Sequence, residues 1–157
     1  MKIIIAPLIV LLTFLIAPKY AFSDSGIEEF AGNYEYVSGP QNTTGCGNFK
    51  IDLNESMDGL NVFHIDTNGY EFLMYEFPYV NKGTMPWQYN WGDGVARGTQ
   101  KVVYNGRSLA KEVQVKGLFG RTVRRNFTNM YFEQNDKLTI KFQSADSNYE
   151  CRVIRIN

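Results

Sequence analysis

The sequence has 157 residues, of which 15% are aromatic, and its 16 basic and 16 acidic side chains give a formal net charge of zero. Such a balance argues against a nucleic-acid-binding protein, which usually carries a strongly basic surface. The chain is long enough for one domain with a buried core.

The first 23 residues are typical of a targeting segment. Lys2 supplies a positive start, residues 3–17 are largely apolar, and residues 21–23 resemble a cleavage site. The apolar run is shorter than the roughly twenty residues that a membrane span needs. We therefore expect residues 1–23 to be a cleaved signal peptide and residues 24–157 to form a single β-barrel domain. The mature protein would be secreted or periplasmic, with no stable membrane anchor.

Residues 30–38 predict the first strand, with Tyr34 on an aromatic face of period two. A short helical turn is expected before it. Asp24 or Ser25 is placed to cap this turn, and Glu28 stands three residues after Ser25, as in a capping box.

Further strands are predicted wherever apolar residues alternate with polar ones between Gly, Asn and Asp turns. Their ranges are 49–54, 60–67, 70–77, 100–104, 109–116, 122–133, 137–143 and 149–156. Residues 78–98 are less regular. They form either a short strand with Trp87, Tyr89 and Trp91 on one face, or a long connection with these aromatic side chains at its tip.

Short strands and tight turns without a long amphipathic helix predict an all-β fold. An antiparallel meander closed into a barrel of eight to ten strands is favoured, because closure removes exposed edges. A β-sandwich remains an alternative.

The chain contains two cysteines, Cys46 and Cys151. Export would bring both into an oxidising compartment, where such a pair usually forms a disulfide. The bond would close a loop of about 105 residues and contribute roughly 4 to 5 kcal/mol in the chain-entropy model. A nucleophilic cysteine would need a histidine partner, and His64 is the only histidine.

The pattern Phe30-x-Gly32-x-Tyr34, with Arg155 near the end of the last strand, resembles the calycin superfamily of lipocalins and fatty-acid-binding proteins. Those proteins pack an aromatic residue of the first strand against an arginine of the last. The resemblance implies that Gly32, Tyr34 and Arg155 form a structural cluster that closes the barrel, with Arg152 as the second choice. Tyr34 replaces the tryptophan that is usual there.

Together these features predict a binding protein that holds a small apolar or amphipathic molecule. Five aromatic residues, which stack well on ligands, are expected to line the mouth: Tyr70, Phe72, Trp87, Tyr89 and Trp91. Arg124 is the expected anchor for a ligand carboxylate. Whether the barrel is hollow stays open, because small barrels are often filled by side chains.

A second hypothesis is an extracellular protein-protein module, for example a hydrolase inhibitor, that acts through the aromatic loop 78–98. An enzyme is not expected, since no catalytic motif, cofactor motif or set of metal ligands stands out, and His64 reads as structural. A run of basic residues surrounds the turn 117–120. It indicates either a solvated hairpin face or a site for an anionic partner such as a phosphate, an acidic polysaccharide or a membrane headgroup. The run comprises Lys111, Lys116, Arg121, Arg124 and Arg125.

Overall fold

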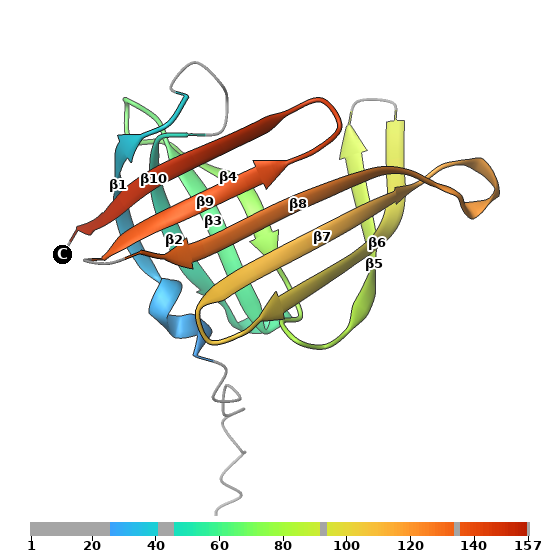
Figure 1. Ribbon diagram of the computed structural model, residues 1–157, viewed down its shortest axis with the longest axis horizontal. Coiled ribbons are helices and arrows are strands. Elements are labelled where there is room, and N and C mark those ends of the chain that lie inside the picture. Colours follow the sequence, from blue (N-terminus) through green and yellow to red (C-terminus); the bar gives the residue numbers. More distant parts are fainter. Residues whose placement is uncertain (1–25, 41–45, 92–93, 134–135, 157) are drawn as a thin grey trace, which may run out of the picture.

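Antiparallel strands account for most of the computed structural model, which describes residues 26–40, 46–91, 94–133 and 136–156 (Figure 1). The strands are β1 (Gly32–Ser38), β2 (Asn48–Asn54), β3 (Gly59–Ile65), β4 (Glu71–Phe77), β5 (Thr84–Trp91), β6 (Gly94–Tyr104), β7 (Ser108–Lys116), β8 (Thr122–Phe132), β9 (Lys137–Gln143) and β10 (Asn148–Ile156). Short 3-10 segments are η1 (Ile27–Phe30), η2 (Glu55–Met57) and η3 (Leu118–Gly120). The all-β prediction is confirmed.

All ten strands belong to one antiparallel sheet in the order β4-β3-β2-β1-β10-β9-β8-β7-β6-β5. Strands that follow one another in the chain pair in this sheet, except β4 and β5, and β1 also pairs with β10 from the other end of the chain. The sheet bends around an interior, so that β2–β4 lie behind β7–β9 in Figure 1. This is the predicted meander, formed by one continuous sheet rather than by the two sheets of a sandwich.

The expected closure of the barrel is wrong. β4 and β5 are the two edges of the sheet, and no ladder joins them among the described residues. The connection between them makes no hairpin, and Tyr79 and Asn81 within it have left-handed backbones (φ 53° and 59°). Its N–H groups bond elsewhere: Tyr79 N donates to the carbonyl of Met57 (2.7 Å) and Asn81 N to that of Val102 (3.0 Å). The chain therefore crosses the end of the interior before β5 begins.

The irregular region 78–98 contains strand β5, which pairs with β6 from Thr84–Lys101 to Trp91–Gly94. The first of the two predicted alternatives, a strand, is thus the correct one. Pro86 lies within it, and an edge strand tolerates proline because one of its sides carries no ladder.

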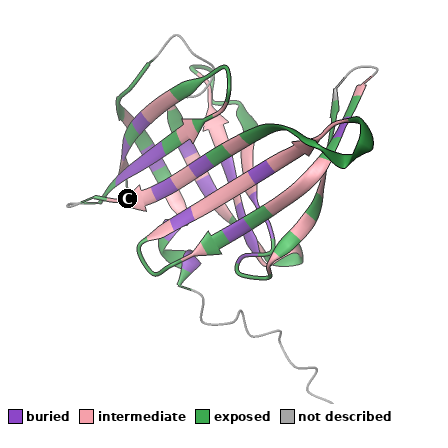
Figure 2. Ribbon diagram, turned by 45° about the vertical axis from the view of Figure 1, so that its right-hand side comes forward, coloured by how far each residue is buried: buried purple, intermediate pink, exposed green. Residues whose placement is uncertain are grey.

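Buried side chains alternate with more exposed ones along parts of several strands, such as β2 and β10 (Figure 2). The hydrophobic core gathers toward η1, which lies at the lower end of the interior in Figure 1. Phe30 of η1 stacks on Phe132 (5.0 Å between ring centroids) and meets the edge of Tyr104 (6.2 Å). This end of the interior is therefore filled.

The predicted capping box at η1 stays a prediction, because its cap residues are not described. The N-cap is Gly26, with a left-handed backbone (φ 72°), and no described side chain caps the turn. Asp24 and Ser25 lie outside the described residues. The turn is held by tertiary contacts, such as the bond from the Tyr104 hydroxyl to Glu29 Oε1 (2.8 Å).

Gly32, Tyr34 and Arg155 do come together at the lower end. The Tyr34 hydroxyl donates to the Phe30 carbonyl (2.9 Å) and accepts from Arg155 Nη2 (2.9 Å), and the guanidinium also bonds to the Glu29 carbonyl. Arg155 lies 5.5 Å from the centre of the Tyr34 ring. A Cβ at Gly32 would stand 3.4 Å from Arg155 Nε, so glycine leaves room for the guanidinium.

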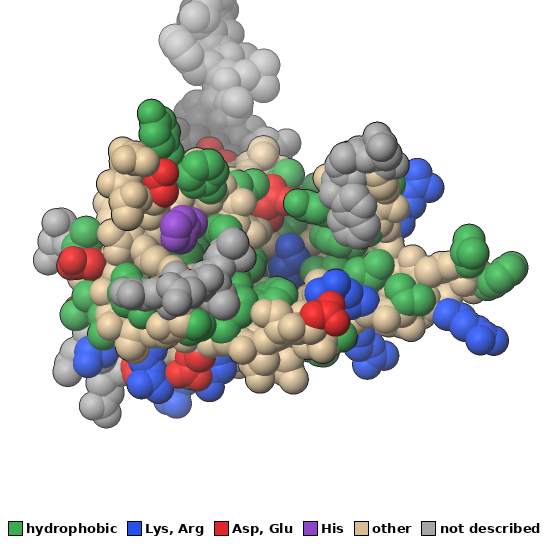
Figure 3. All heavy atoms as spheres, turned by 90° about the horizontal axis from the view of Figure 1, so that it is seen from above, with side chains coloured by type: hydrophobic (Ala, Val, Ile, Leu, Met, Phe, Trp, Pro, Cys, Tyr) green, Lys and Arg blue, Asp and Glu red, His purple; other side chains and the backbone are tan. Residues whose placement is uncertain are grey.

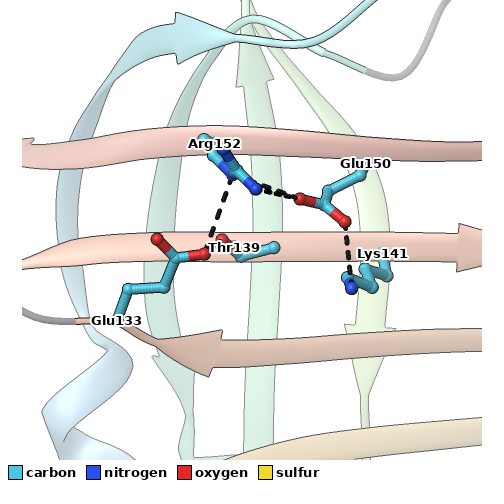
Figure 4. A network of polar contacts seen from close by, with 5 residues as sticks. All are labelled: Glu133, Thr139, Lys141, Glu150 and Arg152. Atoms are coloured by element: carbon cyan, nitrogen blue, oxygen red, sulfur yellow. Dashed lines mark hydrogen bonds and ion pairs between the residues drawn. The ribbon is translucent and has the colours of Figure 1, made fainter.

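Arg152, the second choice for this cluster, lies in a different network on the outer face of β9 and β10 (Figure 4). Its guanidinium pairs with Glu150 (2.9 Å) and lies 3.7 Å from Glu133. Glu150 also binds Lys141 (3.0 Å), and Thr139 donates to Glu133 (2.7 Å). Exposed pairs of this kind contribute little individually, and here they neutralise charge across neighbouring strands.

The predicted disulfide is confirmed. Cys46, just before β2, is bonded to Cys151 in β10, with Cα atoms 5.4 Å apart and both side chains buried. The bond ties the start of β2 to the last strand, β10.

Candidate functional site

The upper end of the interior, opposite η1, is where the predicted mouth residues lie. Seen from above, this end is hollowed between hydrophobic side chains, and a Lys or Arg side chain is visible inside the hollow (Figure 3). Tyr70, just before β4, is 66% exposed, and Phe72 in β4 is 54% exposed. Phe72 pairs with His64, in line with the inward-facing Val62 and Leu60 of β3. It therefore lies on the inner face of the edge strand β4.

Trp87 and Tyr89 lie on the inner face of the other edge strand, β5. They pair with Gly98 and Ala96 of β6, which share a face with the buried core residue Val102. Their rings are stacked, 6.3 Å apart with an angle of 7° between planes. The backbone of Trp91 ends β5, but its side chain lies outside the described part of the structure.

Arg124, the predicted anchor, lies at the start of β8 and is held at the rim. Its guanidinium forms an ion pair with Asp146 (3.1 Å) and donates to Asn126 (3.1 Å) and Ser144 (3.3 Å). An arginine with these partners is less available to a ligand inside the hollow.

Lys111 is the cation that the interior does contain. It lies on the inner face of β7 between Leu109 and Val113, and its ammonium reaches across to donate to the backbone carbonyl of Glu76 in β4 (2.6 Å). Burial lowers the pKa of this ammonium to about 8, against the opposing influence of the Glu76 carboxylate. Among the described residues, no carboxylate forms an ion pair with the Lys111 ammonium. Its hydrogen-bond acceptor there is the Glu76 carbonyl alone.

Sequence reasoning placed Lys111 in the basic run beside the β7–β8 turn. The alternation of β7 could have found it, because Leu109, Lys111 and Val113 share one parity. A lysine between two buried positions of a strand is unusual, since lysine is seldom buried without a partner.

A group of aromatic side chains lies across the interior at a similar level. The hydroxyls of Tyr75 (β4) and Tyr149 (β10) are hydrogen-bonded, and both rings stack with Phe142 of β9 (6.3 and 5.1 Å). Burial raises the pKa of both hydroxyls. Because Tyr75 and Tyr149 pack against the core, this group forms a floor between the filled lower end and the upper hollow.

Another polar group on the inner face has no partner. Gln100 of β6 pairs with Val113, next to Lys111 on β7, and its Oε1 is buried without a hydrogen bond among the described residues. A buried amide oxygen without a donor is costly. The Lys111 ammonium and the Gln100 side-chain oxygen can thus still form hydrogen bonds, and both lie in one otherwise apolar wall of the interior.

His64 packs edge-on against Phe49 (5.9 Å) and covers Gly47, in agreement with a structural role. No group of His, Cys, Asp or Glu side chains that fits a metal ion is found where the structure describes the chain. Within the same ranges, no helix has the length and apolarity to cross a bilayer.

Comparison with solved structures identifies the fold. The protein aligns with lipid binding protein 8 (LBP-8) of Caenorhabditis elegans at a TM-score of 0.55 and 12% identity, over 83% of this chain and 97% of that chain. The fold is calycin-like. The calycin-like fold is shared with the wild-type fluorescent protein UnaG (TM-score 0.51, 10% identity, covering 83% and 99%). It is shared too with a mutant of the REP1-NXSQ fatty acid transporter (0.50, 12%, covering 82% and 98%). No protein-family model and no curated protein matches the sequence.

Proposed function

We propose that this chain is an exported binding protein that holds a small amphipathic molecule in the upper part of its interior. The anionic head of the ligand would bind the Lys111 ammonium, and its apolar part would lie along Phe72, Trp87 and Tyr89. The observation that carries this proposal is Lys111, a partly buried cation whose recorded acceptor is a single carbonyl. An ammonium has three N–H donors, so two remain for a ligand oxygen.

The surrounding residues support an amphipathic ligand. The inner faces of β4 and β5 offer exposed aromatic rings, and burying apolar ligand surface against them contributes roughly 25 cal/mol per Å². Two of the similar folds are named a lipid binding protein and a fatty acid transporter, which agrees with an apolar tail. Tyr70 and Arg124 lie farther out, at the rim, where they would contact a ligand that protrudes.

Export is a second part of the proposal. The apolar N-terminal segment, residues 1–23, would be removed, leaving 24–157 as the mature domain. The Cys46–Cys151 bond supports an oxidising destination, because disulfides rarely persist in the cytosol. The alternative of an inhibitor acting through a loop at 78–98 has less support, since residues 84–91 form a strand with aromatic residues on its inner face.

The test compares two ligands with the same tail and different heads, oleate and oleyl alcohol. Equilibrium binding of both radiolabelled compounds is measured on delipidated protein, for the wild type and for Lys111→Met. We expect Lys111→Met to weaken oleate binding at least about tenfold, the usual size of one charged hydrogen bond, and to change oleyl alcohol binding little.

Lys101→Met is the matched control, because Lys101 lies one position before the buried Val102 and is therefore exposed on the outer face of β6. It should bind both compounds as the wild type does. Equal oleate affinity in wild type and Lys111→Met would show that this ammonium is no anchor. Absence of binding for both compounds would remove a lipid-like ligand altogether.

A further inference from the structure

The hairpin between β7 and β8 extends beyond the neighbouring strands and ends in two exposed apolar side chains (Figure 1). Leu118 is 86% exposed and Phe119 is 99% exposed. The turn that carries them is tight: Gly117 N donates to the Arg121 carbonyl (2.9 Å) and Gly120 N to the Gly117 carbonyl (3.2 Å). The two side chains are thus held outward by a defined turn.

The exposed turn is unfavourable in free energy, and no contact of Leu118 or Phe119 within the described residues offsets this cost. Phe119 has a left-handed backbone (φ 63°), a conformation in which bulky residues are seldom found. Val123, which packs over Gly117, adds a third apolar side chain that is 66% exposed. Contiguous exposed apolar surface of this kind usually marks a contact site.

Basic side chains stand directly behind the apolar tip, as the right-hand projection in Figure 3 shows. Arg121 and Arg125 have no hydrogen bond or ion pair from their guanidinium groups to any other residue that the structure describes. Among the described residues, the Lys116 ammonium bonds to neutral groups alone, Thr122 Oγ1 (2.8 Å) and Gln114 Oε1 (3.4 Å). The charge of the hairpin is therefore largely uncompensated.

We propose that the β7–β8 tip docks on a bilayer that contains anionic lipid. Leu118 and Phe119 enter the region between headgroups and acyl chains, while the basic side chains behind them contact phosphates. A convex tip with apolar residues at its end and cations one or two residues back matches the layering of a bilayer surface. A polyanion without an apolar layer would leave Leu118 and Phe119 without a role. The proposal holds whether or not the interior binds a ligand.

The test is co-sedimentation of the folded, disulfide-bonded protein with vesicles of phosphatidylcholine alone and with phosphatidylglycerol added. We expect binding that requires phosphatidylglycerol. Leu118→Ser/Phe119→Ser should weaken it at least about tenfold, because two apolar side chains no longer leave water. The matched control is Leu73→Ser/Val37→Ser, which removes two half-exposed apolar side chains (50% and 47%) elsewhere and should bind as the wild type does.

A second pair of variants tests the charge. Arg121→Gln/Arg125→Gln should weaken binding about tenfold or more, since each basic residue near an anionic surface contributes on the order of a factor of five. Arg107→Gln/Lys137→Gln removes the same charge from the β6–β7 turn and the start of β9, at the far ends of β7 and β8 from the tip, and should have little effect. Urea unfolding establishes that each variant is folded.

Two results would overturn the proposal. One is failure of the wild type to bind vesicles that contain phosphatidylglycerol. The other is full binding by Leu118→Ser/Phe119→Ser together with loss in Arg121→Gln/Arg125→Gln, because that pattern describes a contact with polyanions in general, such as an acidic polysaccharide, without insertion of the tip.

Discussion

Lys111→Met is the substitution that tests most of the reasoning about the interior. The side chain keeps its length but loses its charge, so the folded protein no longer holds a partly buried ammonium. Burial lowers the pKa of Lys111 from 10.5 to about 8. At about 1.4 kcal/mol per unit, this corresponds to roughly 3 kcal/mol of unfavourable free energy in the folded state at neutral pH.

The substitution also removes the hydrogen bond to the Glu76 carbonyl, which costs on the order of 1 kcal/mol. We therefore expect Lys111→Met to raise the free energy of unfolding by about 2 kcal/mol at pH 7. Urea unfolding followed by circular dichroism measures this difference. A residue kept for ligand binding at a cost in stability would show this behaviour, and one kept for stability would show the reverse.

The pH dependence gives an independent check with a defined sign. Between about pH 8 and 10.5 the unfolded chain binds more protons at Lys111 than the folded protein does, so stability rises with pH in this window. The slope is at most about 1.4 kcal/mol per pH unit. Measurements should stop near about pH 9.5, because tyrosines with raised pKa values lower the stability at higher pH.

In Lys111→Met this rise should be absent, and the difference from the wild type should narrow as the pH increases from 8 to about 9.5. A variant that is less stable than the wild type at pH 7, or a difference that does not depend on pH, would refute the account of Lys111 as a desolvated cation.

Two further predictions concern contacts that join the first strands to the last strand, β10. Cys46→Ser/Cys151→Ser should lower the free energy of unfolding by about 4 to 5 kcal/mol, measured by urea unfolding, because the bond joins residues 105 positions apart; a loss below about 1 kcal/mol would contradict this. Tyr34→Phe should cost about 1 to 3 kcal/mol, since its hydroxyl bonds to both the Phe30 carbonyl and Arg155, and an unchanged melting temperature would show that the cluster is not structural.

Period-two alternation predicted most of the fold. The two patterned runs 109–116 and 137–143 match β7 and β9 within a residue, because each has one face on the core and one in water. The disulfide followed from cysteine count and compartment alone. The closing contact between Tyr34 and Arg155 was found only through the calycin resemblance, because no local pattern links residues more than 100 positions apart.

Closure of the barrel was not predictable in the same way. Whether β4 and β5 pair depends on the path of the connection between them, and that path is set by tertiary hydrogen bonds to Met57 and Val102. The sequence showed that residues 78–98 are irregular, but irregularity does not distinguish a hairpin from a wide crossing.

The residues of the candidate site could also be predicted from the sequence only in part. Phe72, Trp87 and Tyr89 were found because aromatic residues at spacing two announce a shared face, and that face is the inner one. Lys111 was grouped with the basic residues around the turn 117–120, although its parity belongs to the apolar face. Where charge and parity disagree along a strand, parity decides which side of the sheet a residue occupies.

The gap between the edge strands β4 and β5 is physically connected to the buried ammonium of Lys111. Glu76 lies in β4, an edge strand, and its carbonyl accepts from Lys111 rather than from a strand on the open side. The ammonium thereby links β7 to the edge strand β4 across the interior. Tyr75, the neighbour of Glu76 in β4, contacts Tyr149 nearby. Because one of its three donors is used, an anionic group can bind Lys111 without breaking this link. Ligand binding would then offset the desolvation of the cation while leaving β4 attached, so the bound protein should regain the stability that the empty one lacks.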